Sequence, residues 1–165
     1  MVKDTFCSYC GQRFPDGLGY PRTCQGCRET TWKNPIPVAV LLVPVGDGLL
    51  SIKRGIEPHV GKLALPGGYV NFGETWQAGA VRELKEETGL TVDPAGVELF
   101  ALHSTPDGKA LLVIGATQER LSRVSLWSFQ GTEETSELVV LFAPQELAFP
   151  LHTQAVKDWF ARRGA

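Results

Sequence analysis

The sequence predicts an α/β fold, in which a mixed β-sheet lies between two helices as an α/β/α sandwich and a small four-cysteine ribbon precedes it. Three observations lead to this prediction. All four cysteines lie in the first 27 residues, short apolar runs separated by turn residues follow from Val38, and two stretches read as helices. With 165 residues, 43% of them hydrophobic, the chain can bury one core and carry a small appendage. We expect the ribbon over residues 1–33 and the larger domain over residues 34–165.

The cysteines form two CxxC pairs with thirteen residues between them: Cys7 with Cys10, and Cys24 with Cys27. Each tight turn directs two thiolates at one ion, so this spacing suits tetrahedral Zn²⁺. A disulfide framework is disfavoured because no secretory signal is visible, and a redox motif because no βαβ pattern surrounds either pair. Four thiolates close the coordination shell, so we expect a structural zinc.

The role of the ribbon stays open at this level. It either packs on the larger domain or shapes a homodimer, or it contacts substrate or nucleic acid through its basic residues Arg13, Arg22, Arg28 and Lys33. The formal charge of the chain is −2, which gives no strong nucleic-acid signal. The longest apolar run, residues 38–45, contains Pro44 and is too short to span a bilayer, so we expect no membrane partner and a cytoplasmic location.

The strands of the larger domain are predicted from apolar runs bounded by glycine, proline and polar turns. A buried strand over residues 38–45 turns at Gly46-Asp47-Gly48 and returns over residues 49–54. Further strands are expected at 63–65, 90–92, 97–103, 110–117 and 138–142. The closing helix, residues 153–163, has a stripe of Val156, Trp159 and Phe160 at i, i+3, i+4 spacing, which is typical of core packing.

The other predicted helix carries an unusual cluster of charge. Thr75 suits the N-cap position and Gly89 the C-terminal cap. Glu83, Glu86 and Glu87 fall within an arc of about 100°. These like charges repel one another, and a divalent cation such as Mg²⁺, which prefers oxygen ligands, would offset the repulsion. The alternative is a solvated acidic face; the flexible backbone of Pro66-Gly67-Gly68 and of the turn 71–74, brought up to the same face, favours the metal.

The 23-residue stretch from Gly68 to Leu90 resembles the Nudix hydrolase signature at every fixed position. The resemblance implies hydrolysis of a nucleoside diphosphate linked to another moiety, by attack of water on a phosphorus atom held by Mg²⁺ or Mn²⁺. By position, it makes Glu83, Glu86 and Glu87 the metal-binding glutamates, with Glu83 also a candidate base. It makes Arg82 the residue that orients them, Glu74 the residue that braces loop and helix, and Gly67 the residue whose carbonyl ligates metal.

The resemblance also implies candidates for binding the substrate and for supplying one further metal ligand or base. Arg54, at a strand end, and Gly68 are candidates for binding the substrate. Acidic residues before the last strand resemble the position from which the family supplies a further metal ligand or base; Glu134 is the first choice and Glu137 the second, with a solvated loop as the alternative.

A zinc ribbon ahead of such a domain resembles enzymes that act on NADH, FAD or ADP-ribose, although the downstream motif of the NADH branch is absent. We therefore expect cleavage of the diphosphate in a small nucleotide of this type, which yields a nucleoside monophosphate. The alternatives are pyrophosphohydrolase action on a nucleoside triphosphate or a capped RNA, and, in another class, a nucleic-acid-binding ribbon with a nucleotide-sensing domain. The complete set of glutamates argues against the sensor.

Overall fold

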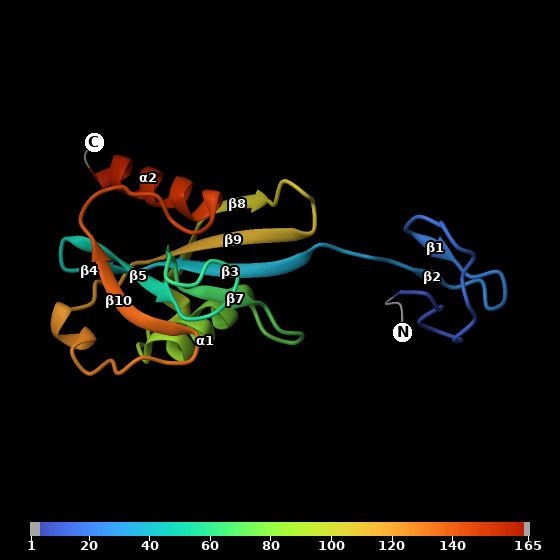
Figure 1. The fold of residues 1–165 in the computed structure, drawn as a ribbon, viewed down its shortest axis with the longest axis horizontal. Helices are drawn as coiled ribbons and strands as arrows, with labels where there is room; N and C mark the ends of the chain where they lie inside the picture. Colours follow the sequence, from blue (N-terminus) through green and yellow to red (C-terminus); the bar gives the residue numbers. More distant parts are fainter. Residues whose placement is uncertain (1–3, 164–165) are drawn as a thin grey trace. The chain divides into compact units, whose positions relative to one another are not determined.

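The structure is a computed structural model, and it is described here for residues 4–163. The chain divides into two compact units between Pro35 and Ile36 (Figure 1). The first unit contains a two-stranded antiparallel hairpin, β1 (Arg22–Thr23) and β2 (Thr30–Thr31). Its small buried cluster consists of Cys7, Phe14 and Cys24, so the cysteines themselves are most of its core.

The second unit contains two sheets. In the first, with strand order β7-β3-β9-β8, the central strand β3 runs parallel to β9 and antiparallel to β7, so the sheet is mixed. The second has the order β10-β5-β4, and β6 also pairs with β5. The bounds are β3 (Ile36–Leu42), β4 (Pro44–Val45), β5 (Gly48–Arg54), β6 (Leu63–Ala64), β7 (Gly67–Tyr69), β8 (Val97–Ser104), β9 (Ala110–Thr117) and β10 (Thr135–Leu141).

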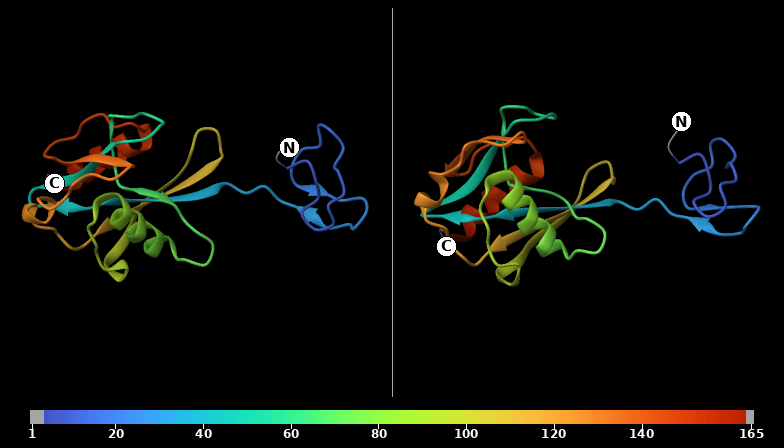
Figure 2. Two further views of the ribbon diagram at one scale, coloured as in Figure 1. Left: turned by 60° about the horizontal axis from the view of Figure 1, so that its bottom comes forward. Right: turned by 90° about the horizontal axis from the view of Figure 1, so that it is seen from below.

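Two α-helices, α1 (Trp76–Thr88) and α2 (Pro150–Arg163), cover opposite faces of the mixed sheet (Figures 1 and 2). The alternation along β3 explains this arrangement, because successive side chains of a strand point to opposite faces. Ala39 and Leu41 belong to the buried cluster that includes Leu84 of α1, whereas Val40 and Leu42 belong to the cluster that includes Val156 of α2. The predicted α/β sandwich is therefore confirmed.

The ends of α1 follow from local chemistry. The hydroxyl oxygen of Thr75 accepts a hydrogen bond from the backbone N–H of Ala78 at 3.2 Å, as an N-cap does. Gly89 adopts φ 72° and donates its N–H to the Lys85 carbonyl at 2.8 Å, and this left-handed conformation is one that glycine adopts without strain. Both caps lie where the sequence predicts them.

One predicted strand does not form. Residues 90–92 have no partner strand, because the N–H of Leu90 donates to the Thr88 hydroxyl at 3.1 Å and Val92 is buried in the core beside α1. Two short 3-10 helices interrupt the loops, η1 (Pro94–Gly96) and η2 (Arg123–Leu126). Among the described residues, no helix has the length and apolar content needed to cross a membrane.

Candidate active site

Two glycines of strand β7, which have no side chains, lie against the acidic face of α1. Gly68 pairs with Ala39 and Gly67 with Val40 of β3. At Gly67, φ is 146° and a Cβ atom would collide with the Ala39 carbonyl oxygen. At Gly68, a Cβ atom would lie 2.5–2.7 Å from the carboxylate atoms of Glu83. The two glycines therefore leave room for carboxylates against the strand.

Glu87 lies at the buried back of this site. Its Oε2 atom accepts a hydrogen bond from the backbone N–H of Gly67 at 2.8 Å. Burial raises the pKa of Glu87 to about 8, against the opposing effect of the Gly67 N–H, and the negative charges of Glu83 and Glu134 raise it further. The fold therefore buries the Glu87 carboxyl group close to other acidic side chains.

Arg82 joins three carboxylates to strand β7. Its Nη1 atom donates to Glu83 at 2.8 Å and to Glu86 at 2.9 Å, and its Nε and Nη2 atoms donate to the two oxygens of Glu74 at 3.2 and 2.8 Å. Nη2 also donates to the Tyr69 carbonyl at 2.9 Å. The planar guanidinium presents all its donors in a fixed fork, so one side chain sets the positions of several acids.

Glu74 connects the loop before α1 to this network. Its Oε1 atom also accepts the backbone N–H of Asn71 at 2.7 Å. Hydrogen bonding from Arg82 and from Asn71 lowers the pKa of Glu74, which therefore stays ionised. Gly79 is part of the same arrangement, because a Cβ atom there would lie 2.8 Å from Glu74 Oε1. These contacts support the bracing role that the sequence assigns to Glu74.

Glu83 differs from Glu74 although both bond to Arg82. Burial raises the pKa of Glu83 and outweighs the lowering effect of Arg82, while Glu86 and Glu134 add negative charge nearby. A partly buried carboxyl group with a raised pKa beside a fixed cation suits a group that accepts a proton during a reaction. The geometry is compatible with the predicted role of Glu83 as a base.

The two acids expected before the last strand lie in different surroundings: Glu134 precedes β10, whereas Glu137 lies within it. The backbone carbonyl of Glu134 accepts the N–H of Gly55 at 2.7 Å, and the charge of Glu134 acts on both Glu83 and Glu87. Glu137 instead pairs with Lys53 at 3.4 Å along the β5–β10 ladder. Glu134 is therefore the acid that belongs with the cluster.

Arg54 supplies a positive charge at the edge of the cluster. Its Nε atom donates to the Pro58 carbonyl at 2.7 Å, and its guanidinium lies 5.2 Å from the ring centroid of Phe149. Its charge lowers the pKa of Glu87 and of His152, so it lies between the acidic cluster and α2. Sequence reasoning missed Pro58 and Phe149 as supports, because no local pattern links residues 54 and 149.

His152 was also missed by sequence reasoning. Its Nδ1 atom accepts the backbone N–H of Leu65 at 3.2 Å, and burial lowers its pKa to about 4. It contacts Phe149, with ring centroids 5.0 Å apart. A histidine in an amphipathic helix gives no signal that distinguishes this buried role from a surface one.

The acidic cluster fits a hard divalent cation by the chemistry of its donors. Several carboxylates meet beside the backbone of Gly67 on one face, and carboxylate and carbonyl oxygens are the ligands that such a cation prefers. The carboxylates of Glu83 and Glu86 are held by Arg82, whereas Glu87 is turned to the N–H of Gly67. Their oxygens therefore share a face without converging on one point.

The four cysteine sulfurs do converge. Their Sγ atoms all lie within 4.8 Å of one another, and among the side chains of residues 4–163 they form the only such group of potential metal ligands. Backbone N–H groups of Cys10 and Tyr9 lower the pKa of Cys7 to about 6, and the backbone at Cys27 lowers that of Cys24. Thiolates in this arrangement fit tetrahedral Zn²⁺.

The family model described as NUDIX domain matches residues 33–162. An ADP-ribose pyrophosphatase of Methanocaldococcus jannaschii is 49% identical over 66 residues, which are 40% of this chain and 38% of that protein. The NAD-capped RNA hydrolase NudC of Salmonella heidelberg is 30% identical over 88 residues, 53% of this chain and 34% of that protein.

Among solved structures, a NUDIX hydrolase from Nitrosomonas europaea has a TM-score of 0.79 and 26% sequence identity, with 97% of this chain and 92% of that chain covered. The matches to the two curated relatives span only 38% and 34% of those proteins.

Proposed function

Because the chain belongs to the NUDIX domain family, we propose that it is a metal-dependent pyrophosphohydrolase that cleaves the diphosphate joining a nucleoside to another moiety. The observation that carries this proposal is the Arg82 network, which fixes three carboxylates beside the buried Glu87 and the glycine backbone of β7. The proposed substrates are FAD, NADH or ADP-ribose, and the product is a nucleoside monophosphate. Similarity to a protein named ADP-ribose pyrophosphatase supports this class.

Glu83, Glu86, Glu87 and the Gly67 carbonyl would hold Mg²⁺ or Mn²⁺, with Glu134 as a further ligand or base. When bound, the ions supply the positive charge that neutralises the diphosphate in the transition state. Arg82 keeps Glu83 and Glu86 in register, and Arg54 offers its guanidinium to a phosphate oxygen.

The reaction is a displacement at phosphorus. The oxygen of a water molecule forms a bond to one phosphorus atom while the bond from that atom to the bridging oxygen breaks. The bridging oxygen leaves with the second phosphate, and the proton of the water passes to the carboxylate of Glu83. Both oxygens of Glu74 accept hydrogen bonds from Arg82 or Asn71, whereas Arg82 bonds to Glu83 through Oε1, so Glu83 is the better placed of the two to accept the proton.

A release assay with Mg²⁺ or Mn²⁺ tests the proposal across FAD, NADH, ADP-ribose, diadenosine polyphosphates, nucleoside triphosphates and capped RNA. We expect turnover of a diphosphate-bridged compound and its loss in Glu86→Gln; because the Glu86 side chain is 59% exposed, we expect this variant to keep its fold. Glu98→Gln on the edge strand β8 is the matched control, because it removes an exposed carboxylate outside the cluster. Equal turnover in wild type and Glu86→Gln would contradict the metal-site assignment.

The second candidate is hydrolysis of a nucleoside triphosphate or a capped RNA. It is favoured by the relative named NAD-capped RNA hydrolase, which matches about half of this chain. Preference for capped RNA over free dinucleotide in the same assay would select it. The structural zinc in the ribbon, a homodimer and a cytoplasmic location are further parts of the proposal, and they rest on the sequence.

A further inference from the structure

A groove at the C-terminal end of α1 shares Glu86 with the acidic cluster, and its other lining residues have no role in the chemistry proposed above. Its volume is about 330 Å³, at the lower end of the range for small-molecule sites. It lies between the last turn of α1 and the segment that follows η2. We call it the helix-end groove; the lining residues that matter here are Lys85, Glu86, Ser128, Phe129, Gln130 and Thr132.

Both walls of the helix-end groove lead to the acidic cluster. Glu86 lines the groove with its exposed side and, through its carboxylate, accepts from Arg82 at 2.9 Å. The opposite wall continues from Thr132 to Glu134, whose charge acts on Glu83 and Glu87. The groove is therefore within reach of a group attached to a diphosphate at the carboxylates.

The side chains that line the groove suit an uncharged ring with hydroxyl groups. Phe129 is half-buried and offers an aromatic surface, while Ser128, Gln130 and Thr132 offer polar atoms. Lys85 is the one cation among the lining residues and lies next to Glu86, so the groove lacks the several cations that would bind a phosphate chain. Planar rings stack favourably on aromatic side chains, so Phe129 is the lining residue suited to hold such a ring.

The wall that carries Phe129 is held in place without a ligand. The N–H of Phe129 donates to the Leu126 carbonyl at 3.2 Å, and Leu126 packs against the core cluster beside α1. Thr132 and Thr135 exchange two bonds, at 2.8 and 3.0 Å, which close the turn before β10. A preformed wall lowers the ordering cost of binding.

We propose that the helix-end groove binds the ring-bearing moiety of the substrate, a nucleoside, nicotinamide or flavin group, and that Phe129 stacks on that ring and determines specificity. This inference rests on the proposed function, since it takes the diphosphate to lie at the acidic cluster. Phe129 is a binding residue, so its loss weakens binding and leaves the chemical step intact.

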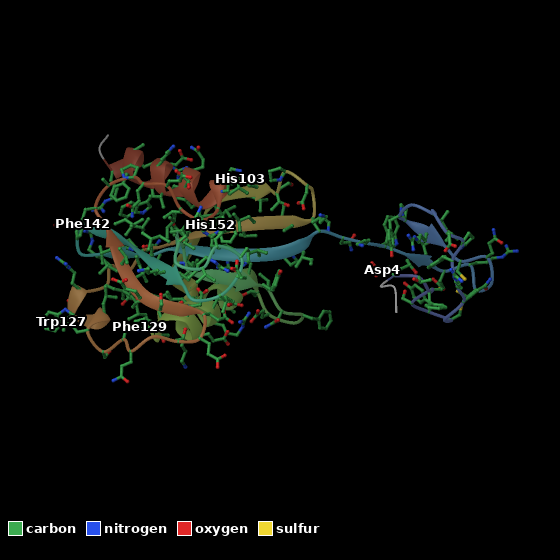
Figure 3. All side chains as sticks on the ribbon, in the orientation of Figure 1. Asp4, His103, Trp127, Phe129, Phe142 and His152 are labelled. Atoms are coloured by element: carbon green, nitrogen blue, oxygen red, sulfur yellow. The ribbon has the colours of Figure 1, made fainter. Side chains whose placement is uncertain are left out.

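The test compares Phe129→Ala and Phe129→Tyr with Trp127→Ala. Trp127 is 80% exposed and does not line the groove; Figure 3 shows it at the outer edge, with Phe129 between it and α1. Trp127→Ala therefore removes an aromatic ring from the same segment but not from the groove. KM and kcat are measured on the best substrate, and calorimetry measures the Kd of AMP, nicotinamide mononucleotide and FMN, with inorganic pyrophosphate as a ring-free probe.

We expect Phe129→Ala to raise KM, and the Kd of at least one of the three nucleotides, by at least about fivefold, with kcat within about twofold. Phe129→Tyr restores wild-type values, and pyrophosphate binding is unchanged. The inference is overturned if Phe129→Ala matches Trp127→Ala for every nucleotide, or if pyrophosphate binding weakens equally. Absence of turnover on every substrate would instead refute the proposed function, and the nucleotide binding data would still judge the groove.

Discussion

Among single residues, the buried Glu87 makes the free energy of unfolding depend on pH. Its pKa of about 8 lies well above the unfolded value, so the folded state binds a proton that the unfolded state has lost above pH 5. Without a bound cation, the contribution of Glu87 to the free energy of unfolding is complete below about pH 4.5 and is lost as the pH rises through 8. A bound divalent cation would remove this penalty, because it stabilises the ionised form.

We predict that, without added divalent cations, the wild-type protein loses about 2 kcal/mol of stability between pH 6.5 and 8 through Glu87. Glu87→Gln keeps an oxygen that accepts the Gly67 N–H but cannot ionise, so its stability stays flat in this window while its turnover is abolished. Thermal or urea unfolding at the two pH values measures the difference. An equal pH slope in both proteins would show that another group is responsible.

His152 makes stability depend on pH in the opposite direction to Glu87, and at lower pH. Its pKa of about 4 lies below the unfolded value of about 6.5, so the unfolded state binds the extra proton between these values. The stability it contributes is complete above pH 6.5 and is lost as pH falls towards 4, by about 3 kcal/mol.

For His152→Asn we predict a flatter loss of stability between pH 6.5 and 4 than in the wild type, because the amide oxygen can accept the Leu65 N–H without titrating. Unfolding curves at half-unit steps test this. His103→Asn, at a half-buried position on β8, serves as the control for loss of a histidine elsewhere. The same slope in wild type and His152→Asn would rule out His152 as the titrating group.

At the scale of elements, the site depends on how closely β7 approaches α1. An alanine at position 68 would place its Cβ within 2.7 Å of the Glu83 carboxylate, which must then move away from Arg82. The displaced atoms are the free end of the Glu83 side chain, so the backbone can keep its fold. The carboxylate, however, would no longer lie where the reaction needs it.

We therefore predict that Gly68→Ala lowers kcat about 10²-fold, the cost of a misplacement of about 1 Å, with a small effect on stability. Gly96→Ala is the matched control, since a Cβ atom there meets nothing within 4 Å. Kinetics and unfolding of both variants give the result. A kcat near wild type in Gly68→Ala would mean that Glu83 does not need its present position.

Prediction from sequence succeeds for these elements where the signal is local. The caps of α1 and the gathering of the four cysteines are set by neighbouring residues, and both are found as predicted. The strand expected over residues 38–45 ends at Leu42 and pairs with β7 and β9, so only Pro44 and Val45 form the expected hairpin with β5. The strand expected at 90–92 fails because the Thr88 hydroxyl takes the N–H of Leu90. The support of Arg54 by Phe149, and the burial of His152, depend on contacts between residues nearly 90 or more positions apart, which a single sequence does not encode visibly.

At the scale of the whole molecule, the two units have separate cores. Within residues 4–163, the buried cluster of Cys7, Phe14 and Cys24 contains no residue beyond Pro35, and the larger clusters contain none before it. A cluster of three side chains supplies too little apolar burial to offset chain entropy, so we expect the first unit to need a bound metal in order to fold. The second unit has no such dependence, because its clusters join both sheets and both α-helices.

It follows that Cys24→Ser should release the zinc and unfold residues 1–35, while residues 36–165 keep their fold and their turnover of a free dinucleotide. Metal analysis should give one zinc per wild-type chain and none in the variant, and hydrogen exchange should show lost protection only before Pro35. Ser8→Ala changes a residue between two ligands without removing a thiolate, so it should behave as wild type. Loss of protection in β3 and α1 together with the ribbon would instead mean that the two units fold as one, and that the zinc stabilises the catalytic unit as well.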